Sequence, residues 1–500
     1  MSASLPTATA RHRVLIVGGG FGGLYAAREL GHDDRLAVTL VDRRNHHLFA
    51  PLLYQVATGA LAPADIAQPL RAILRRQRNT TVLLGEAKGL DADRREVRLD
   101  DGAALGYDSL IVAVGAHHSY FGHDDWAGIA PGLKSIDDAI EIRRKILVAF
   151  EAAEREADPQ RRAEWLTFVI AGGGPTGVEL AGALGEIARD TLRRDFRMID
   201  TSDARIILME GTDRVLQAYP PSVSESACRQ LERLGVTIRT GTRVVDIDER
   251  SVVAAMADGS RERVAAGTIL WAAGVLASSF ARVVADATGA PTDRSGRIQV
   301  EPDLTVPGHP DIFVVGDAAL QRWKKDRPVP GVAQGAIQTG SYAAKTIRAR
   351  LSGEAMKPFR YFNRGDVAVI GRLSGVTDIP WLGPFGRQSG FPAWFLWLGI
   401  HIVYLIGFAN RLVVIIRWAW SFLTHGRNSR LITGQPLLPP LVEPVGSEVA
   451  ATEGRRAGTD GTGTAADGAG PDGSGTPVEL PAAPEPPEPP EPEPAVSRTR

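Results

Sequence analysis

Short apolar runs that end in glycine or an acidic residue recur along most of the chain, with helix-like stretches between them. The first three runs are Val14–Val17, Ala37–Val41 and Leu110–Val114. Buried strands of a parallel sheet have this continuous apolar character, and helical crossovers must connect them. A second set of runs follows: Thr167–Ala171, Arg205–Met209, Thr268–Ala272 and Ile312–Val315. The pattern predicts an α/β fold with parallel sheets.

A different pattern begins near residue 391, where the chain becomes apolar and aromatic. The segment Pro392–Ala409 contains no Asp, Glu, Lys or Arg. It is close to the ~20 residues that a membrane-spanning helix needs. However, Arg411 follows this segment, and Arg417 interrupts the next apolar run, Leu412–Leu423. A charge at mid-span costs at least ~2.5 kcal/mol, so a spanning helix is the weaker interpretation.

The composition around these two runs is typical of helices that lie on a membrane surface. No acidic residue occurs from Ile379 to Val442, and the tryptophans of this region mix with Leu, Ile, Phe and several arginines. In such helices the apolar face enters the acyl boundary, while arginines contact anionic head groups. We predict two amphipathic helices, joined near Gly407–Arg411, that anchor residues 391–423 to a membrane surface. A buried core helix and a dimer interface are the alternatives.

The two ends of the chain have compositions of their own. Glu443–Arg500 is rich in Pro, Gly, Glu and Ala and almost lacks aromatic residues. Such a segment cannot bury enough surface to offset the entropy of ordering, so we expect a disordered tail over residues 437–500. Met1–His12 has no apolar core and no cleavage-like motif. We therefore expect no secretory signal and a cytoplasmic location for the bulk of the chain.

Charge and cysteine content exclude several classes of function. Lys plus Arg is 57 and Asp plus Glu is 58, so the net charge is −1. This balance argues against a general nucleic-acid-binding protein. Cys228 is the single cysteine, which excludes an internal disulfide, a CxxC redox pair and a cysteine-based metal centre. We predict no metal site, and any electron chemistry must come from a bound cofactor.

The first apolar run leads into a glycine motif of the dinucleotide-binding type. Gly18-Gly19-Gly20-Phe21-Gly22-Gly23 fits GxGxxG and opens a helix. Gly18 allows a tight turn, Gly20 lets a pyrophosphate approach the backbone, and Gly23 lets the helix pack closely on the strand. The helix N-terminus favours the phosphates. Asp42, at the end of the next strand, can accept hydrogen bonds from a ribose.

The motif occurs a second time, at Gly172-Gly173-Gly174-Pro175-Thr176-Gly177, before a helix expected to begin at Val178. Its acidic residue is Glu210, which lies further along than the ~20 residues usual for this motif. A carboxylate here accepts from a ribose 2′-hydroxyl and repels a 2′-phosphate. NADH is therefore favoured over NADPH, although Arg214 is close in sequence.

Two motifs in one chain predict two dinucleotides, which are ordinarily a permanently held FAD and a nicotinamide cofactor that comes and goes. A third element supports the flavin. Ile312–Val315 runs into Gly316-Asp317, where the backbone can approach a flavin and Asp317 can bind ribitol hydroxyls.

The order of these motifs resembles the flavoprotein disulfide reductase superfamily. The segments between them are similar to type II NADH dehydrogenases: HHLFAPLLYQVATG at 46–59, AQGAIQ at 333–338, which matches the AQxAxQ quinone-site motif, and VIGR at 369–372. The resemblance covers about Arg13 to Leu431. The chain lacks the redox cysteines of disulfide reductases and sulfide:quinone reductases.

This resemblance implies a membrane-surface NADH:quinone oxidoreductase of the respiratory chain. A hydride would pass from NADH to FAD, and two electrons would then reduce quinone to quinol without proton pumping. It also implies a homodimer, peripheral (monotopic) on the cytoplasmic face of the cell membrane. We expect an FAD-binding domain in two parts, 11–130 and 296–378, an inserted NAD(H)-binding domain, 131–295, and a membrane-associated helical region, 379–436.

Three residues are the catalytic candidates. Glu179 is expected in the first turn of its helix, where a favourable position in the helix dipole is the simple interpretation. The resemblance suggests contact with the nicotinamide and proton transfer instead. Gln334 and Gln338 share a helix face; in the family the first lies by the isoalloxazine and the second lines the quinone entrance. Arg372 is a further candidate, for stabilising quinolate charge.

A larger set of residues is expected at the two cofactors. The FAD set is Gly18, Gly20, Phe21, Gly22, Gly23, Asp42, Arg43, Gln55, Ala87, Ala113, Gly115, Asp317 and Gln334. The NADH set is Gly172, Gly174, Pro175, Thr176, Gly177, Glu179, Glu210, Ala273 and Gly274.

Two other functions remain open. A soluble NADH-dependent FAD reductase would pass electrons to a ferredoxin- or rubredoxin-like protein, but it would have no use for the acid-free aromatic surface of Ile379–Val442. A non-enzymatic NADH-sensing flavoprotein would signal through a partner bound by the same stretch. Membrane fractionation tests the first alternative, and steady-state turnover tests the second.

Overall fold

The computed structural model describes residues 11–324, 327–424, 426–427, 429–434 and 438. The expected disordered tail, 437–500, lies outside the described residues apart from residue 438, and so does most of the N-terminal stretch.

The first sheet is built from the apolar runs of the N-terminal part of the chain. Its strand order is β20-β21-β9-β1-β2-β5, and all neighbours are parallel except β20 and β21. Four of its strands form the centre: β1 (His12–Val17), β2 (Leu36–Asp42), β9 (Ser109–Val112) and β21 (His309–Val314). The outer two are β5 (Thr80–Leu84) and β20 (Thr305–Val306). β21 returns from far along the chain to complete this sheet.

A second sheet repeats the same unit. Its order is β13-β12-β11-β17, all parallel. The strands are β11 (Thr167–Ala171), β12 (Arg205–Met209), β13 (Val236–Arg239) and β17 (Thr268–Trp271). The helices of the unit are α7 (Pro175–Glu186) and α8 (Pro221–Arg233). The α/β fold with two dinucleotide-type sheets therefore agrees with the sequence pattern.

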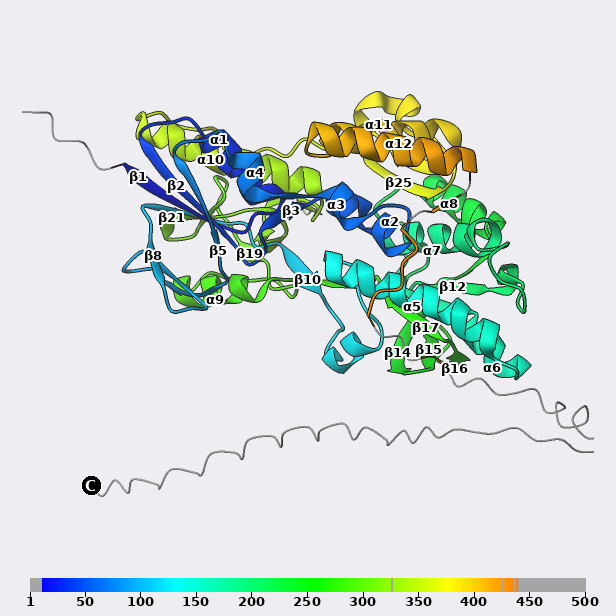
Figure 1. The fold of residues 1–500 in the computed structure, drawn as a ribbon. Coiled ribbons are helices and arrows are strands. Elements are labelled where there is room, and N and C mark those ends of the chain that lie inside the picture. The colour runs from blue at the N-terminus through cyan, green and yellow to red at the C-terminus, as the bar shows by residue number, and fades with distance from the viewer. Residues whose placement is uncertain (1–10, 325–326, 425, 428, 435–437, 439–500) are drawn as a thin grey trace, which may run out of the picture. The chain divides into compact units, whose positions relative to one another are not determined.

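Each sheet carries a smaller antiparallel sheet beside it. The first is β6-β7-β8, over Ala87–Asp91, Glu96–Leu99 and Ala104–Gly106. The second is β14-β15-β16, over Thr242–Asp248, Ser251–Met256 and Arg261–Ala265. Figure 1 shows each of these small sheets at the outer edge of its own half of the described chain.

The chain crosses between the two halves at a pair of short antiparallel strands. These are β10 (Ala116–His118) and β18 (Val275–Ala277). The helix after the second crossing, α9 (Ser279–Thr288), packs with Phe280 and Val284 in the core of the first sheet. The apolar face of α9 is therefore buried under the first half. The predicted domain boundaries at 131 and 295 stay predictions.

Two close backbone contacts decide what covers the helices of the two units. α1 (Phe21–Leu30) is covered by α10 (Ala333–Leu351), since a Cβ at Gly340 would overlap the backbone of Gly22. α7 is covered by β25 (Asp366–Gly371), since a Cβ at Gly182 would overlap the carbonyl of Ile370. β25 forms a hairpin with β26 (Ser374–Asp378). The assignment of segment 296–378 to the FAD-binding domain stays a prediction.

The predicted C-terminal helices are present. α11 (Phe391–Tyr404) and α12 (Phe408–Thr424) follow one another and lie beside β25 (Figure 1). α11 buries Ala393, Trp397 and His401, which are spaced four apart on one face. Within the part of the chain that the structure describes, every helix is too short or too polar to cross a bilayer.

Candidate active site

The first glycine loop has the geometry that a dinucleotide pyrophosphate requires. Gly18 has a φ of 106°, and a Cβ at Gly23 would overlap the Gly18 carbonyl, so the helix lies directly on the turn. Gly20 is the N-cap of α1 without a side-chain cap, and a Cβ there would meet nothing within 4 Å. The free amides of this helix end therefore face open space, which fits an anionic group.

Asp42 stabilises this loop from the end of β2. One carboxylate oxygen accepts a hydrogen bond from the Gly19 amide at 2.5 Å, and the other accepts one from the Arg44 amide at 2.7 Å. The loop is also supported by His47, a buried side chain whose ring Nδ1 lies 3.1 Å from the Gly19 carbonyl.

The second glycine loop repeats the first. Gly172 has a φ of 107°, and a Cβ at Gly177 would overlap the Gly172 carbonyl. Gly174 is the uncapped N-cap of α7 and also faces open space. Glu210 accepts from the Gly173 amide at 2.6 Å and from the Thr212 amide at 2.9 Å.

Arg214, whose closeness to Glu210 in sequence qualified the preference for NADH over NADPH, forms hydrogen bonds within its own loop. Its guanidinium donates to the carbonyls of Tyr219 and Gln217.

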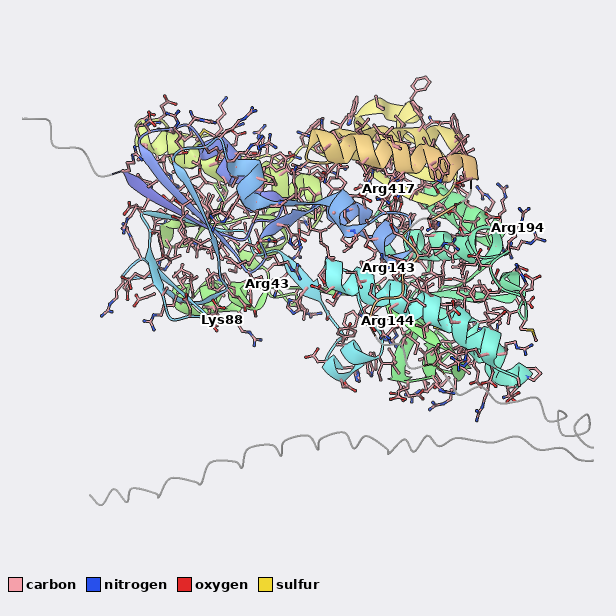
Figure 2. All side chains as sticks on the ribbon, viewed as in Figure 1. Arg43, Lys88, Arg143, Arg144, Arg194 and Arg417 are labelled. Atoms are coloured by element: carbon pink, nitrogen blue, oxygen red, sulfur yellow. The ribbon has the colours of Figure 1, made fainter. Side chains whose placement is uncertain are left out.

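The remaining predicted cofactor residues occupy several positions around the loops. Ala113 lies behind Gly18, and Gly115 and Gly274 are positive-φ glycines that follow β9 and β17. Asp317, after β21, is enclosed, and burial raises the pKa of its carboxyl. The Phe21 ring packs against His47. Arg43 is exposed (Figure 2), and Ala87 lies in β6.

Glu179 lies one turn further into its helix than the sequence suggested. α7 begins at Pro175, not at Val178, so Glu179 is in the second turn. Because the dipole effect is confined to the first turn, the simple helix-dipole explanation is wrong for this residue. Proline at the first helical position accounts for the earlier start, since its missing N–H would be unpaired there anyway.

The Glu179 side chain instead faces a cavity of about 130 Å³. Burial raises the pKa of its carboxyl to about 8. The carboxyl therefore holds its proton at neutral pH and is partly accessible from the cavity.

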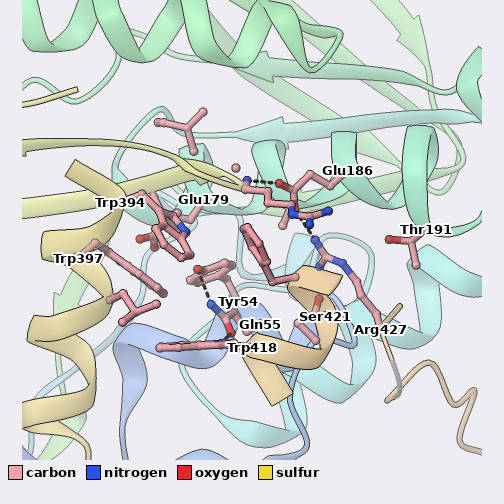
Figure 3. A pocket seen from close by; sticks show the side chains of 18 of the residues that line it. Tyr54, Gln55, Glu179, Glu186, Thr191, Trp394, Trp397, Trp418, Ser421 and Arg427 are labelled. Carbon is pink, nitrogen blue, oxygen red and sulfur yellow. Dashed lines mark hydrogen bonds and ion pairs between the residues drawn. The ribbon is translucent and has the colours of Figure 1, made fainter. Parts of the chain in front are cut away.

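The cavity lies where five elements meet, and Figure 3 shows it from close by. α7 forms a polar wall, β25 forms a second wall, and α11 and α12 form an aromatic wall. The helix α2 (Leu53–Ala57) closes the remaining side with Tyr54 and Gln55. The lining also includes Glu186, Asp190, Thr191, Arg372, Trp394, Trp397, Leu398, Trp418, Ser421, Phe422 and Arg427.

Charged side chains line one end of the cavity and bind one another. Glu186 forms an ion pair with Arg427 at 2.7 Å and also accepts from the Arg372 amide. The Arg427 guanidinium donates in addition to the Thr58 carbonyl at 3.2 Å. The Arg372 guanidinium lies over the Phe422 ring, 4.4 Å from its centroid. Arg372 thus reaches the cavity, and its part in quinone chemistry stays a prediction.

Gln55 was expected at the flavin, but its side-chain amide forms hydrogen bonds with two residues that line the cavity. Its Nε2 donates to the Tyr54 hydroxyl at 2.8 Å, and its Oε1 accepts from the Trp418 indole at 2.7 Å. Figure 3 shows these three side chains running from α12 to the middle of the cavity.

Gln334 and Gln338 share one face of α10, as predicted, but both amides bind backbone. Gln334 donates to the Gly365 carbonyl and accepts from the Arg364 amide, each at 3.0 Å. Gln338 makes the same pair of bonds to Phe362. Neither side chain lines the cavity that contains Glu179. A direct contact of either amide with a flavin or quinone would have to replace these bonds.

Sequence reasoning missed several lining residues. Glu186 could have been found, because it lies seven residues after Glu179 and so on the same helix face. Tyr54 lay inside a quoted motif without a role. Arg427 carries no local signal, since only the fold brings it to Glu186. Among the described residues, no three His, Cys, Asp or Glu side chains gather into a metal-binding group.

The chain matches known proteins along most of its length. Residues 12–340 match the pyridine nucleotide-disulphide oxidoreductase family. The chain is 46% identical to the type II NADH:quinone oxidoreductase Ndh of Mycobacterium tuberculosis over 431 residues, which cover 85% of this chain and 91% of that protein. It is 44% identical to NdhA of the same organism, over 88% of this chain and 94% of that protein.

A solved structure has a similar fold. NDH2 from Plasmodium falciparum, in complex with NADH, has a TM-score of 0.76 and 19% sequence identity, and the match covers 85% of this chain and 100% of that chain.

Proposed function

This chain belongs to the pyridine nucleotide-disulphide oxidoreductases and, among them, to the type II NADH:quinone oxidoreductases, and we propose that it oxidises NADH and reduces a membrane quinone with FAD as its bound cofactor. The observation that carries the proposal is the cavity around Glu179. It joins the helix of the second dinucleotide loop to the aromatic wall of α11 and α12.

The residues around the two loops fit the two dinucleotides. The open helix end at Gly20, with Asp42 behind it, would hold the FAD pyrophosphate and ribose, and the enclosed Asp317 would bind the ribitol. The Gly174 helix end and Glu210 would hold NADH in the same way. When bound, the flavin accepts two electrons from the nicotinamide and passes them to the quinone.

Glu179 is suited to hold a proton for this reaction. Quinone reduction by NADH consumes one proton from the medium, and a carboxyl with a pKa of about 8 carries that proton at neutral pH. The ion pair between Glu186 and Arg427 lies at the other end of the same cavity. We propose that protons reach Glu179 from that side.

The aromatic wall suits the ring of a quinone. Trp394, Trp397 and Phe422 line it, and planar aromatic side chains stack favourably on a planar apolar ring. Gln334 and Gln338 would contribute by holding the segment 362–365, which leads directly into β25. This role differs from the direct contact that the family motif implies.

We also propose that α11 and α12 attach the protein to a membrane surface as a peripheral protein, without proton pumping. Large apolar residues of these helices are exposed: Phe391, Phe395, Val403, Leu412, Val413, Ile415, Ile416, Trp420, Phe422 and Leu423. Exposed large apolar residues that gather on two consecutive helices are typical of an interaction site. Attachment to the cytoplasmic face and a homodimer built partly by this region belong to the same proposal. Vesicle flotation and light scattering in detergent test them.

The test of the function is NADH oxidation by detergent-purified protein, with a soluble quinone analogue as acceptor and a spectrum of the bound flavin. We expect NADH to bleach the flavin, quinone to restore its colour within the mixing time, and NADPH to react much more slowly. Bleaching without reoxidation by quinone would favour a protein acceptor. A flavin that NADH does not bleach would refute the proposal.

A further inference from the structure

We propose that Tyr54 donates a hydrogen bond to a quinone oxygen in the cavity, and that Gln55 and Trp418 are positioning residues that direct its hydroxyl proton. This inference rests on the proposed function, since it names a contact for the quinone. It concerns side chains that stand outside the glycine loops and outside the AQxAxQ motif.

The direction of the hydrogen bonds follows from the chemistry of the three groups. An indole N–H can only donate, so the bond from Trp418 at 2.7 Å requires the amide oxygen of Gln55 to face α12. The amide nitrogen must then face Tyr54, and it can only donate as well. The Tyr54 oxygen is therefore the acceptor of that bond, at 2.8 Å.

The Tyr54 hydroxyl can therefore still donate a hydrogen bond to another group. Within the described part of the chain, no protein group accepts this proton. The side chain is buried but lines the cavity beside Glu179. Burial and the neighbouring Glu179 carboxyl raise the pKa of Tyr54 well above its ordinary value, so the hydroxyl stays protonated. A buried donor without a partner is costly, and an oxygen acceptor in the cavity removes that cost.

A quinone is the acceptor whose chemistry fits. Its carbonyl oxygens accept hydrogen bonds in the oxidised form and gain negative charge as electrons arrive, so a neutral donor stabilises the reduced state more than the oxidised state. Its ring suits the Trp394 and Trp397 side of the cavity. Glu179 is protonated in the same cavity and can supply a proton.

The chain of bonds also links the donor to the surface helix. Trp418 of α12 packs against Trp397 of α11, with ring centroids 5.3 Å apart. Its indole N–H also donates to Gln55 of α2. The donor at Tyr54 is thus oriented only when α12 is seated on α2. Loss of that contact would free the Gln55 amide to rotate and would let the Tyr54 proton turn back toward it.

The first test is Tyr54→Phe in the flavin-loaded, detergent-purified protein, with decylubiquinone as the quinone. We expect kcat/KM for the quinone to fall about tenfold or more, because one donor to the developing charge is lost. Flavin bleaching by NADH and turnover with ferricyanide should stay within about twofold of wild type. Tyr342→Phe is the matched control, because it removes a tyrosine hydroxyl bond to the Lys357 carbonyl, away from the cavity.

The second test is Trp418→Phe, which keeps an aromatic ring and removes the indole N–H. We expect a fall of about threefold to tenfold in kcat/KM for the quinone, and no further fall when Trp418→Phe is added to Tyr54→Phe. Additive losses would show that Trp418 acts by packing and not through Tyr54. Trp418→Phe also carries the test if Tyr54→Phe does not retain flavin.

The outcomes separate this inference from the proposed function. If wild-type protein reduces decylubiquinone and Tyr54→Phe does so equally well, the donor role is refuted and the function stands. If wild-type protein oxidises NADH with ferricyanide but not with any quinone, the proposed function fails first.

Discussion

The two glycine loops of this chain are nearly the same structure, yet the helices that follow them have different surroundings. In both, an acidic residue at the end of the second strand binds the amide of the middle glycine, at 2.5 Å for Asp42 and 2.6 Å for Glu210. In both, the last glycine lies against the carbonyl of the first. The loops therefore provide the same backbone binding surface for a dinucleotide.

The helices differ in what covers them. α1 is covered by another helix, α10, and the residue corresponding to Glu179 on it is Tyr25. α7 is covered by the strand β25, which leaves a cavity that α11 and α12 complete. The comparison teaches that the repeated unit supplies binding, while the element packed on its helix decides whether a titratable group is enclosed there.

The largest difference between the two loops is expected when the last glycine of each is replaced by a residue with a side chain. Gly23→Val and Gly177→Val would both force the helix off its turn, since a Cβ already overlaps the carbonyl opposite. We expect Gly23→Val to purify without flavin. Gly177→Val should keep its flavin and lose at least about 100-fold in the rate of reduction by NADH. Absorbance spectra and stopped-flow reduction measure the two effects, and a flavin-free Gly177→Val would show that the halves do not bind independently.

The next prediction concerns the equivalent helix positions. Glu179→Gln should lower quinone turnover about 100-fold, the loss typical of a general acid, because the amide cannot release a proton. Tyr25→Phe should stay within about twofold of wild type. Steady-state kinetics with NADH and decylubiquinone compare the variants. Equal losses in both would indicate that the helices serve binding alone.

The enclosed carboxyl should also be visible in the pH dependence of stability. The pKa of Glu179 is raised from 4.5 to about 8 in the folded protein. Its contribution to stability is fully present below pH 4.5 and is lost as pH rises to about 8, because the unfolded chain releases a proton that the folded chain keeps. Since the group is partly accessible, we expect wild type to lose about 2 kcal/mol relative to Glu179→Gln across this window.

Denaturant unfolding of the flavin-loaded proteins at several pH values measures this difference. The gap between wild type and Glu179→Gln should widen from pH 5 to pH 8 and then stay constant. A difference in unfolding free energy that does not change with pH would contradict a raised pKa for Glu179.

The smallest expected effect comes from the loop acids. Each accepts two backbone hydrogen bonds, and a charge-assisted bond contributes about 1.5–3 kcal/mol. Glu210→Ala should raise KM for NADH about tenfold, weaken the preference over NADPH, and leave flavin content unchanged. Asp42→Ala should do the reverse: it should lose flavin on dialysis and keep its affinity for NADH. Loss of flavin in both variants would break the assignment of one loop to each cofactor.

The local elements could be predicted because their causes are local. Thr167–Ala171 and Arg205–Met209 have the predicted limits, because each consists of one polar residue and four consecutive apolar residues between turn signals. The helix start at Pro175 was missed by three residues because a proline inside a glycine motif is a weak signal. Of the candidate site, the sequence predicted only the parts that belong to local motifs, which are the two glycine loops and their acidic residues.

Other parts of the site depend on packing between distant segments. Gln55 belongs to a flavin-site motif, yet its amide binds Trp418 of α12. Gln334 and Gln338 belong to a quinone-site motif, yet their amides hold Phe362 and Gly365. Motif matching identifies residues that matter, but it does not say which partner each polar atom has, because that partner comes from another part of the chain.

The sequence by itself determined the two strand–loop–helix units, the acid that binds each loop, the family, and the aromatic, acid-free character of α11 and α12. These follow from residue periodicity and from steric rules that act over a few positions. Only the tertiary structure decided that Glu179, Tyr54, Trp397 and Trp418 share one cavity. The physical reason is that burial and hydrogen bonding depend on which surfaces pack together, and here a glycine at 182 lets β25 approach α7 closely enough to build the cavity.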